Sequence, residues 1–228
     1  MLAYHNKPAI KSKYLARVID HRVADEIIQG VYWQNGKGCA VGCTIHSGDH
    51  LKFETELGIP VGLALLEDRI FEGLPNSEAK EFPIQFLSAI RPGANLNGII
   101  DKFMYWLIGG GQDGEFVFKN EGVRAAFVAA QKLMERKLSG ETVPFAEWRK
   151  VGDDAYAIAR KVSVATTEDV DAASVIGYIS ADHAADAASA ATYATEVVYY
   201  AATKDSNNSH RKAFSTMKTK LLQLLADA

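Results

Sequence analysis

The sequence predicts an all-α protein, a multi-helix orthogonal or bundle-like array with an alanine-rich C-terminal half. Apolar residues recur at helical spacing along most of the chain, and glycines and prolines stand where these runs end. A strand-like pattern is confined to a brief stretch at residues 31–33. The chain has 48% apolar and 23% charged residues among 228, which is ordinary for a globular protein, so we expect a packed core.

The first region, residues 1–108, divides into helices at its glycines and prolines. The stops are visible in the sequence, because Gly30, Gly58 and Pro75 each follow an apolar run. Residues 31–38 hold an Asn-Gly pair and further glycines, which indicates a loop after the first helix. The expected helices cover residues 9–29, 49–57, 61–74, 77–90 and 95–108.

The second region, residues 115–228, follows a flexible break marked by glycines 109–111 and 114, and we expect it to pack as one domain with the first. A capping box at residues 166–169 predicts a long alanine-rich helix to residue 204. Because this helix would be close to 60 Å long, we expect a break near residues 177–182. Helices are also expected at 123–138, at 144–162 and along a C-terminal apolar stripe of Phe214, Met217, Leu221, Leu224 and Leu225.

Charge and composition restrict the classes of partner. A net charge of −3 and a pI near 6.1 favour neither nucleic acid nor an anionic membrane. The sequence has no run of roughly 20 apolar residues and no apolar signal segment at its N-terminus. Two cysteines make no disulfide framework, so we expect reduced thiols and a cytoplasmic location. The sequence names no partner and leaves self-association open.

The segment from Gly36 to Glu54 holds most of the groups capable of chemistry. Cys39, Cys43, His46 and His50 follow one another at spacings of four, three and four, and on a helix they would lie within about 60° of one face. Thiolate and imidazole are zinc ligands, so these four residues are a candidate metal site. A straight helix would separate the outer two by about 16 Å, so a shared ion requires the segment to bend.

A nucleophilic cysteine is the second interpretation of this segment. Cys39 follows two glycines and would begin a helix, whose dipole and free amides lower a thiol pKa. The base would be His46, or His21 with Asp25 as the carboxylate that orients it. A redox pair of Cys39 and Cys43 would need local unwinding. The structural interpretation is that the cysteines are small buried apolar residues and the glycines serve close packing.

Glu67 is the other unusual residue. It lies at the centre of an apolar helical stripe, where a carboxylate is costly unless it is paired or bound. We expect Arg69, Arg17 or Arg22 to pair with it. The alternative is that Glu67 faces the Cys/His segment as an acid, a base or a ligand.

The run Tyr-Trp-Gln-Asn-Gly-Lys-Gly-Cys-Ala-Val-Gly-Cys-Thr at residues 32–44, with residues 56–60 and 66–75, resembles a family of uncharacterised proteins from bacteria and their phages. The resemblance covers roughly the first half of the chain. The alanine-rich second half looks like the variable tail of such proteins. This resemblance implies an intracellular setting and a prophage-type origin, and it implies no catalytic residue.

These observations lead to one favoured function and two alternatives. The favoured function is a helical protein that binds a small molecule or a metal, zinc for example, at residues 39–50, and we expect His21, Asp25 and Glu67 to converge on this site. A non-catalytic helical interaction or structural protein of prophage type is the first alternative. A cysteine-dependent hydrolase or transferase is the second.

Overall fold

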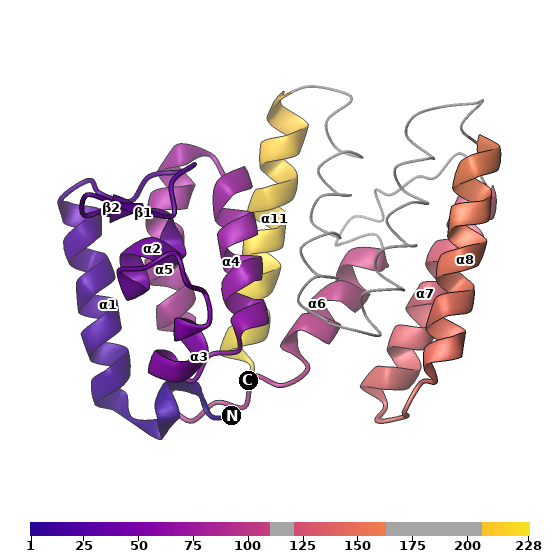
Figure 1. The fold of residues 1–228 in the computed structure, drawn as a ribbon, viewed down its shortest axis with the longest axis horizontal. Helices are drawn as coiled ribbons and strands as arrows, with labels where there is room; N and C mark the ends of the chain where they lie inside the picture. The colour runs from indigo at the N-terminus through magenta and orange to yellow at the C-terminus, as the bar shows by residue number, and fades with distance from the viewer. Residues whose placement is uncertain (110–120, 163–206) are drawn as a thin grey trace. The chain divides into compact units, whose positions relative to one another are not determined.

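The computed structural model describes residues 1–109, 121–162 and 207–228, and these residues form the all-α architecture that the sequence predicts (Figure 1). Contacts divide the chain into two compact units. The first unit combines Met1–Ile99 with His210–Ala228, and the second covers Ile100–Ser209. The last helix therefore belongs to the first unit, whereas the expected division at residues 108 and 115 groups it with the alanine-rich region.

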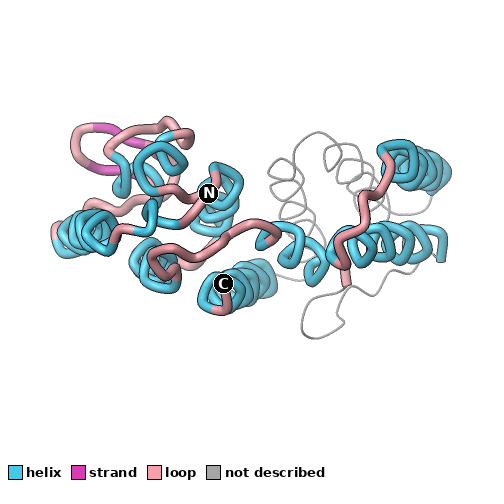
Figure 2. Tube along the Cα trace, turned by 90° about the horizontal axis from the view of Figure 1, so that it is seen from below, coloured by secondary structure: helices cyan, strands magenta, loops and turns pink. Residues whose placement is uncertain are grey.

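The first unit packs its helices around α4, which contacts α2, α3 and α5, while α1 contacts α2 and α5. Figure 2 shows the two short strands at the edge of this unit. Its elements are η1 (Ala3–Asn6, a 3-10 turn), α1 (Pro8–Val23), β1 (Trp33–Gln34), β2 (Lys37–Gly38), α2 (Ala40–Ile45), α3 (Lys52–Leu57), α4 (Val61–Gly73), α5 (Asn76–Ala89) and α11 (Asn207–Ala226). Its core consists of fully buried side chains that include Phe53, Leu57, Leu63, Leu66, Phe71, Phe82 and Phe86.

The C-terminal helix α11 is fastened to the first unit by polar and apolar contacts. Ser215 Oγ donates to Glu78 Oε1 at 2.8 Å, and Lys218 forms an ion pair with the same carboxylate in the first turn of α5. Phe214 lies so close to Gly73 that a Cβ there would stand 2.4 Å from its ring. A glycine at the end of α4 therefore makes room for the ring of α11.

Helix α1 ends at Val23, six residues before the expected end. Asp25 adopts a left-handed conformation with φ of 56°, which stops the helix. The following residues pair with the hairpin, since Gly38 N donates to Glu26 O at 3.1 Å and Ile28 N donates to Gly38 O at 2.8 Å. These backbone bonds to a distant glycine decide the helix end, which apolar periodicity in residues 9–29 does not reveal.

Residues 31–38 form a small antiparallel hairpin in the predicted loop. Asn35 and Gly36 both have positive φ, 51° and 81°, as a two-residue turn between twisted strands requires. Trp33 pairs with Gly38, and Cys39 N donates to Val31 O at 2.7 Å. The brief pairing expected at residues 31–33 is therefore present, with β2 as its partner.

The hairpin lies in direct backbone contact with α2 because two glycines have no side chain. A Cβ at Gly38 would stand 2.2 Å from Tyr32 O, and one at Gly42 would stand 1.6 Å from the same oxygen. Real Cβ atoms do not approach an oxygen so closely. Tyr32 and Trp33 can therefore lie over α2 only because these two positions are glycine.

The Cys/His segment bends at its third candidate residue. Cys39 is the N-cap of α2, and His46 follows the last residue of this helix in a left-handed conformation with φ of 52°. His46 N donates to Gly42 O at 2.8 Å, which closes the helix end. The four Cys and His residues therefore do not share one helical face.

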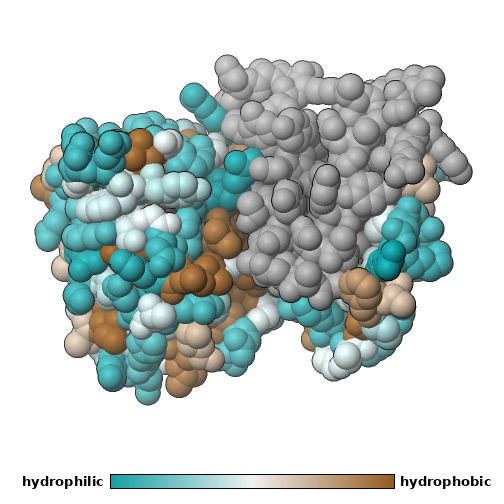
Figure 3. Space-filling model, in the orientation of Figure 1, coloured by the Kyte–Doolittle hydropathy of each residue, from teal (hydrophilic) through white to brown (hydrophobic). Residues whose placement is uncertain are grey.

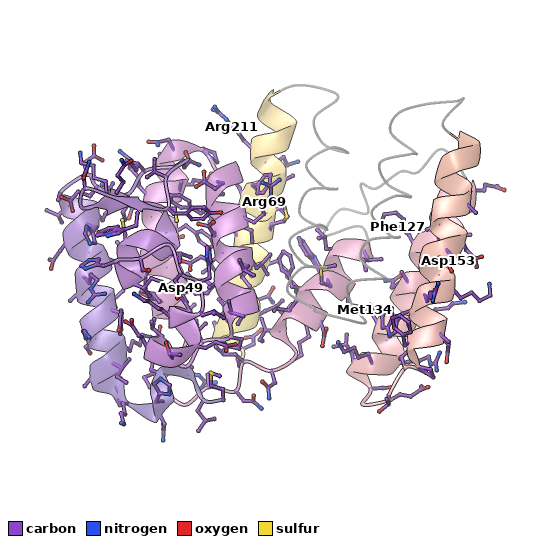
Figure 4. All side chains as sticks on the ribbon, in the orientation of Figure 1. Asp49, Arg69, Phe127, Met134, Asp153 and Arg211 are labelled. Atoms are coloured by element: carbon purple, nitrogen blue, oxygen red, sulfur yellow. The ribbon has the colours of Figure 1, made fainter. Side chains whose placement is uncertain are left out.

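The second unit contains α6 (Ile99–Ile108), α7 (Glu121–Leu138) and α8 (Phe145–Val162). Helices α7 and α8 pack together, and Figure 4 shows Phe127 and Met134, both buried, on α7. The helices expected at 123–138 and 144–162 are confirmed. The expected capping box at residues 166–169, the long alanine-rich helix and its break at 177–182 lie outside the described residues.

None of the helices in the described ranges has both the length and the apolar character needed to cross a bilayer. Figure 3 shows a face of the first unit that is mostly hydrophilic with apolar residues among the polar ones. Its exposed large apolar residues include Val23, Tyr32 and Leu51.

The close contact between the hairpin and α2 predicts that Gly42→Ala will destabilise the first unit. The new methyl group would meet a backbone oxygen, which cannot rotate away, so we expect the free energy of unfolding to fall by about 1–3 kcal/mol or more. Gly48→Ala is the matched control, since its Cβ would make an ordinary 3.4 Å contact with the Tyr32 side chain. Urea unfolding measures both variants, and equal midpoints would contradict the packing argument.

Candidate functional site

Helix α2 separates two histidine sites. Its N-cap, Cys39, lies near Asp68 and belongs to the same polar cluster as His50, whereas the residue after its last turn, His46, contacts His21. The adjacent aromatic residues of the hairpin divide in the same way. Trp33 stacks on His46, and the ring of Tyr32 meets His50 edge-on. Each histidine of the segment is thus held by its own aromatic ring.

Two short contacts hold the His21–His46 pair in place. His21 Nδ1 lies 2.6 Å from Glu26 Oε2, and His21 Nε2 lies 2.7 Å from His46 Nε2. Because a carboxylate only accepts hydrogen bonds, Nδ1 of His21 is the donor. Neutral His21 therefore presents a lone pair at Nε2 toward His46.

Trp33 and Arg17 lie next to the His21–His46 pair. The indole lies 4.7 Å from the His46 ring and is tilted by 11°, and it meets His21 edge-on at 5.5 Å. His46 is exposed, whereas the His21 side chain is only 11% exposed. Partial loss of hydration lowers the pKa of His46, and the positive charges of Arg17 and His21 lower it further. His46 therefore favours the neutral form, which can act as an acceptor or a ligand.

The Asp68–His50 pair lies at the other end of α2. His50 Nε2 stands 3.7 Å from Asp68 Oδ2, and both side chains are nearly buried, at 13% and 12% exposure. His50 Nε2 and Asp68 Oδ1 are buried and have no hydrogen-bond partner among the described residues. The polar groups of this second site are thus close together and incompletely satisfied.

Both cysteines are buried as protonated thiols. Cys39 is 1% exposed and Cys43 is fully buried. Burial raises the pKa of Cys39, and the charge of Asp68 and a hydrogen bond to it raise it further. Burial raises the pKa of Cys43 to about 12. The expected position of Cys39 at a helix start is confirmed, but the expected lowering of its pKa is wrong, because burial and a carboxylate outweigh the amide of Gly42.

The four predicted metal ligands point to different partners. Cys43 Sγ donates to Gly38 O at 3.3 Å, while Cys39 and His50 lie near Asp68 and His46 contacts His21. Among the described residues, no group of three or more His, Cys, Asp or Glu side chains is arranged to hold a metal ion. A site made of Cys39, Cys43, His46 and His50 together is therefore not formed here.

The carboxylate that orients His21 is Glu26 rather than Asp25. Asp25 points to Lys80, with which it forms an ion pair. Sequence spacing favoured Asp25, since it lies one helical turn after His21, but the helix ends at Val23. The left-handed Asp25 turns the chain so that the next residue, Glu26, faces the imidazole. The pairing of His21 with His46 joins residues 25 positions apart, and no sequence signal indicates it.

Glu67 is completely buried in α4, and within the part of the chain that the structure describes neither of its carboxyl oxygens has a hydrogen-bond partner. The expected arginine pairing is wrong. Arg22 bonds to Glu81, and Arg17 donates to Thr44 O, while the oxygens of Glu67 accept nothing from Arg69. Burial, followed by the charge of Asp68, raises the pKa of Glu67 well above its ordinary value. Burial therefore favours the protonated, neutral form of the Glu67 carboxyl group.

No protein-family model, curated protein or solved structure matches the chain. The resemblance to a family from bacteria and phages stays a prediction. Function is therefore argued from the two histidine sites alone.

The raised pKa of Glu67 predicts a pH-dependent gain in stability for Glu67→Met. In the unfolded chain Glu67 loses its proton above its ordinary pKa of 4.5, whereas in the folded protein it keeps the proton to a higher pH. Raising the pH above 4.5 therefore favours the unfolded chain, and the contribution of Glu67 to the stability of the fold falls. Methionine matches glutamate in length and needs no hydrogen bond, so we expect a gain of about 1–3 kcal/mol in the free energy of unfolding. The gain should be larger at pH 8 than at pH 5. Urea unfolding at both values tests this, and a gain that shrinks with pH would contradict it.

The buried thiols predict slow alkylation. In the native protein, iodoacetamide at pH 7 should label Cys39 and Cys43 far more slowly than in urea, because a protonated, buried thiol is a poor nucleophile. Mass spectrometry after timed labelling measures each residue. Rapid native labelling of Cys39 would instead support the cysteine-dependent hydrolase or transferase.

Proposed function

We propose that the first unit binds a divalent transition metal through the Nε2 atoms of His21 and His46. The observation that carries this proposal is the 2.7 Å approach of the two nitrogens, with Glu26 behind His21. The proposal keeps the metal-binding function expected from residues 39–50 but changes the ligands. His46 is still a ligand, and His21 from α1 takes the place of the two cysteines and His50.

The separation of the two nitrogens is close to that of two ligands on one ion. Imidazole nitrogens bind zinc at about 2.0–2.1 Å, so two of them at square or tetrahedral angles stand about 2.9–3.4 Å apart. The two nitrogens would need to separate by a few tenths of an ångström. Exposed His46 can supply that movement, since the more buried His21 is held by Glu26.

Glu26 has the role of an outer carboxylate. Ligating histidines usually donate their second N–H to a carboxylate or carbonyl, which fixes the tautomer and makes the ligand more basic. Glu26 accepts from His21 Nδ1 in this way. The lowered pKa of His46 acts in the same direction, because a metal then competes with fewer protons.

Two protein ligands leave coordination positions for water or for a small molecule. Imidazole ligands suit zinc, copper and nickel, and copper(II) binds most tightly in the usual series. Trp33 lies flat against His46 and offers an aromatic surface beside those positions. The site therefore supports binding of a small ligand at an open metal ion.

A second candidate function uses the same residues without a metal. The short contact between the two Nε2 atoms holds one proton between the imidazoles, with Glu26 at the inner end and His46 at the surface. Such a chain can transfer a proton to a bound molecule as a general acid or base. It predicts one proton shared between the two rings in the absence of a metal.

The metal proposal predicts copper(II) binding that depends on both histidines. Titration calorimetry and quenching of Trp33 fluorescence should report one site, and His21→Ala or His46→Ala should each weaken binding by about tenfold or more. Glu26→Gln should weaken it by about 10- to 100-fold through loss of the outer carboxylate. Binding should also weaken as pH falls, because protons compete for both nitrogens.

His5→Ala is the matched control, since His5 is exposed on the same unit and bonds to Thr55 O rather than to another histidine. Equal affinity in wild type, His21→Ala and His46→Ala would overturn the metal proposal. NMR signals of a proton shared between the two rings, recorded without metal, would then favour the proton-transfer chain. If both results are negative, a helical interaction protein is the alternative to test by light scattering.

A further inference from the structure

We propose that Asp68 and His50 form a second binding site, which recognises a primary ammonium group of a small molecule. This site shares no residue with the His21–His46 pair and does not depend on a metal. Its basis is a carboxylate and an imidazole that face each other across 3.7 Å with polar atoms left unsatisfied.

The unsatisfied atoms indicate that a partner is missing from this position. Asp68 is 9% exposed, its Oδ1 atom is buried, and that atom accepts no hydrogen bond. His50 Nε2 is also buried and has no hydrogen-bond partner among the described residues. Buried polar atoms in native proteins are almost always hydrogen-bonded to protein, water or a ligand. A group with several hydrogen-bond donors beside this carboxylate and imidazole would supply the partner that each side chain lacks.

Charge indicates that the missing partner is a cation. The negative charge of Asp68 is the largest cause that raises the pKa of Tyr32, and it adds to the effect of burial on the pKa values of Cys39 and Glu67. Within the described part of the chain, His50 is the one basic side chain that forms an ion pair with Asp68, and its Nε2 is too distant for a hydrogen bond. A cation with several N–H groups would offset this charge and also donate to neutral His50.

The separation of the two polar atoms fits a primary ammonium group. Asp68 Oδ2 and His50 Nε2 stand 3.7 Å apart, and two atoms at that distance can both lie at about 2.7–3.2 Å from one nitrogen, so a single –NH3⁺ group can donate to each. The hydroxyl of Tyr32 is near enough to feel the charge of Asp68, and its ring meets His50 edge-on at 5.6 Å.

Tyr32 also explains how a ligand reaches the pair. Tyr32 is 59% exposed and its ring meets the His50 ring edge-on, while the side chains of His50 and Asp68 stay 13% and 12% exposed. A ligand that approaches along the Tyr32 ring would reach the pair without moving the backbone, which Gly38 and Gly42 hold against α2. The aromatic face can then contact the ammonium or its first methylene groups.

The test compares n-propylammonium with propan-1-ol and with tetramethylammonium by NMR of the His50 ring in the full-length protein. We expect n-propylammonium to shift the His50 signals in a saturable way. Propan-1-ol lacks the charge and tetramethylammonium lacks N–H donors, so both should bind about tenfold more weakly or worse. Equal responses to the three compounds, or no saturable response to n-propylammonium, would overturn the proposal.

Asp68→Asn tests the carboxylate with little change in shape, and we expect it to weaken n-propylammonium binding by about tenfold or more. Asp49→Asn is the matched control, because Asp49 is an exposed carboxylate in the segment that leads to His50. Unchanged binding in Asp68→Asn would contradict the site. If Asp68→Asn does not fold, the comparison of the three compounds on wild type still decides. The measurement uses no metal, so its failure leaves the His21–His46 proposal intact.

Discussion

The arrangement of both sites depends on one close backbone contact, that of Tyr32 O with α2 and β2. It exists because Gly38 and Gly42 have no Cβ, and either side chain would occupy the space of that oxygen. Gly38 also exchanges backbone hydrogen bonds with Glu26 and Ile28. The same residue thus ties together the end of α1, the hairpin and the start of α2, which carry most of the polar groups of the two sites.

This contact has a chemical consequence because adjacent hairpin residues contact different histidines. Trp33 stacks on His46, and Tyr32 meets His50 edge-on, while the left-handed conformation of His46 turns the chain between them. One histidine is thereby joined to His21 and Glu26, and the other faces Asp68. A straight helix would have kept all four Cys and His residues on one stripe. The bend instead produces two independent pairs with different charge and exposure.

Burial decides the chemistry of the remaining groups. A helix N-terminus stabilises a thiolate, but Cys39 is 1% exposed and lies beside a carboxylate, so its thiol stays protonated. Burial also raises the pKa of Glu67, whose carboxyl oxygens have no hydrogen-bond partner among the described residues, so the protonated form is favoured. The groups that keep partial contact with water, His46 and the edge of Asp68, are the ones that the two proposals use.

The sequence by itself determined the helical class, the ends of most helices and the segment that carries chemistry, because these follow from local periodicity and from glycine and proline positions. The hairpin turn is also local, since Asn35 and Gly36 favour positive φ. The tertiary structure decided which groups meet. Glu26 faces His21 because backbone bonds to Gly38 end α1 early, and His21 meets His46 across 25 residues. Such contacts depend on packing between distant segments and on the loss of hydration that packing causes, and neither is encoded in the spacing of residues along one helix.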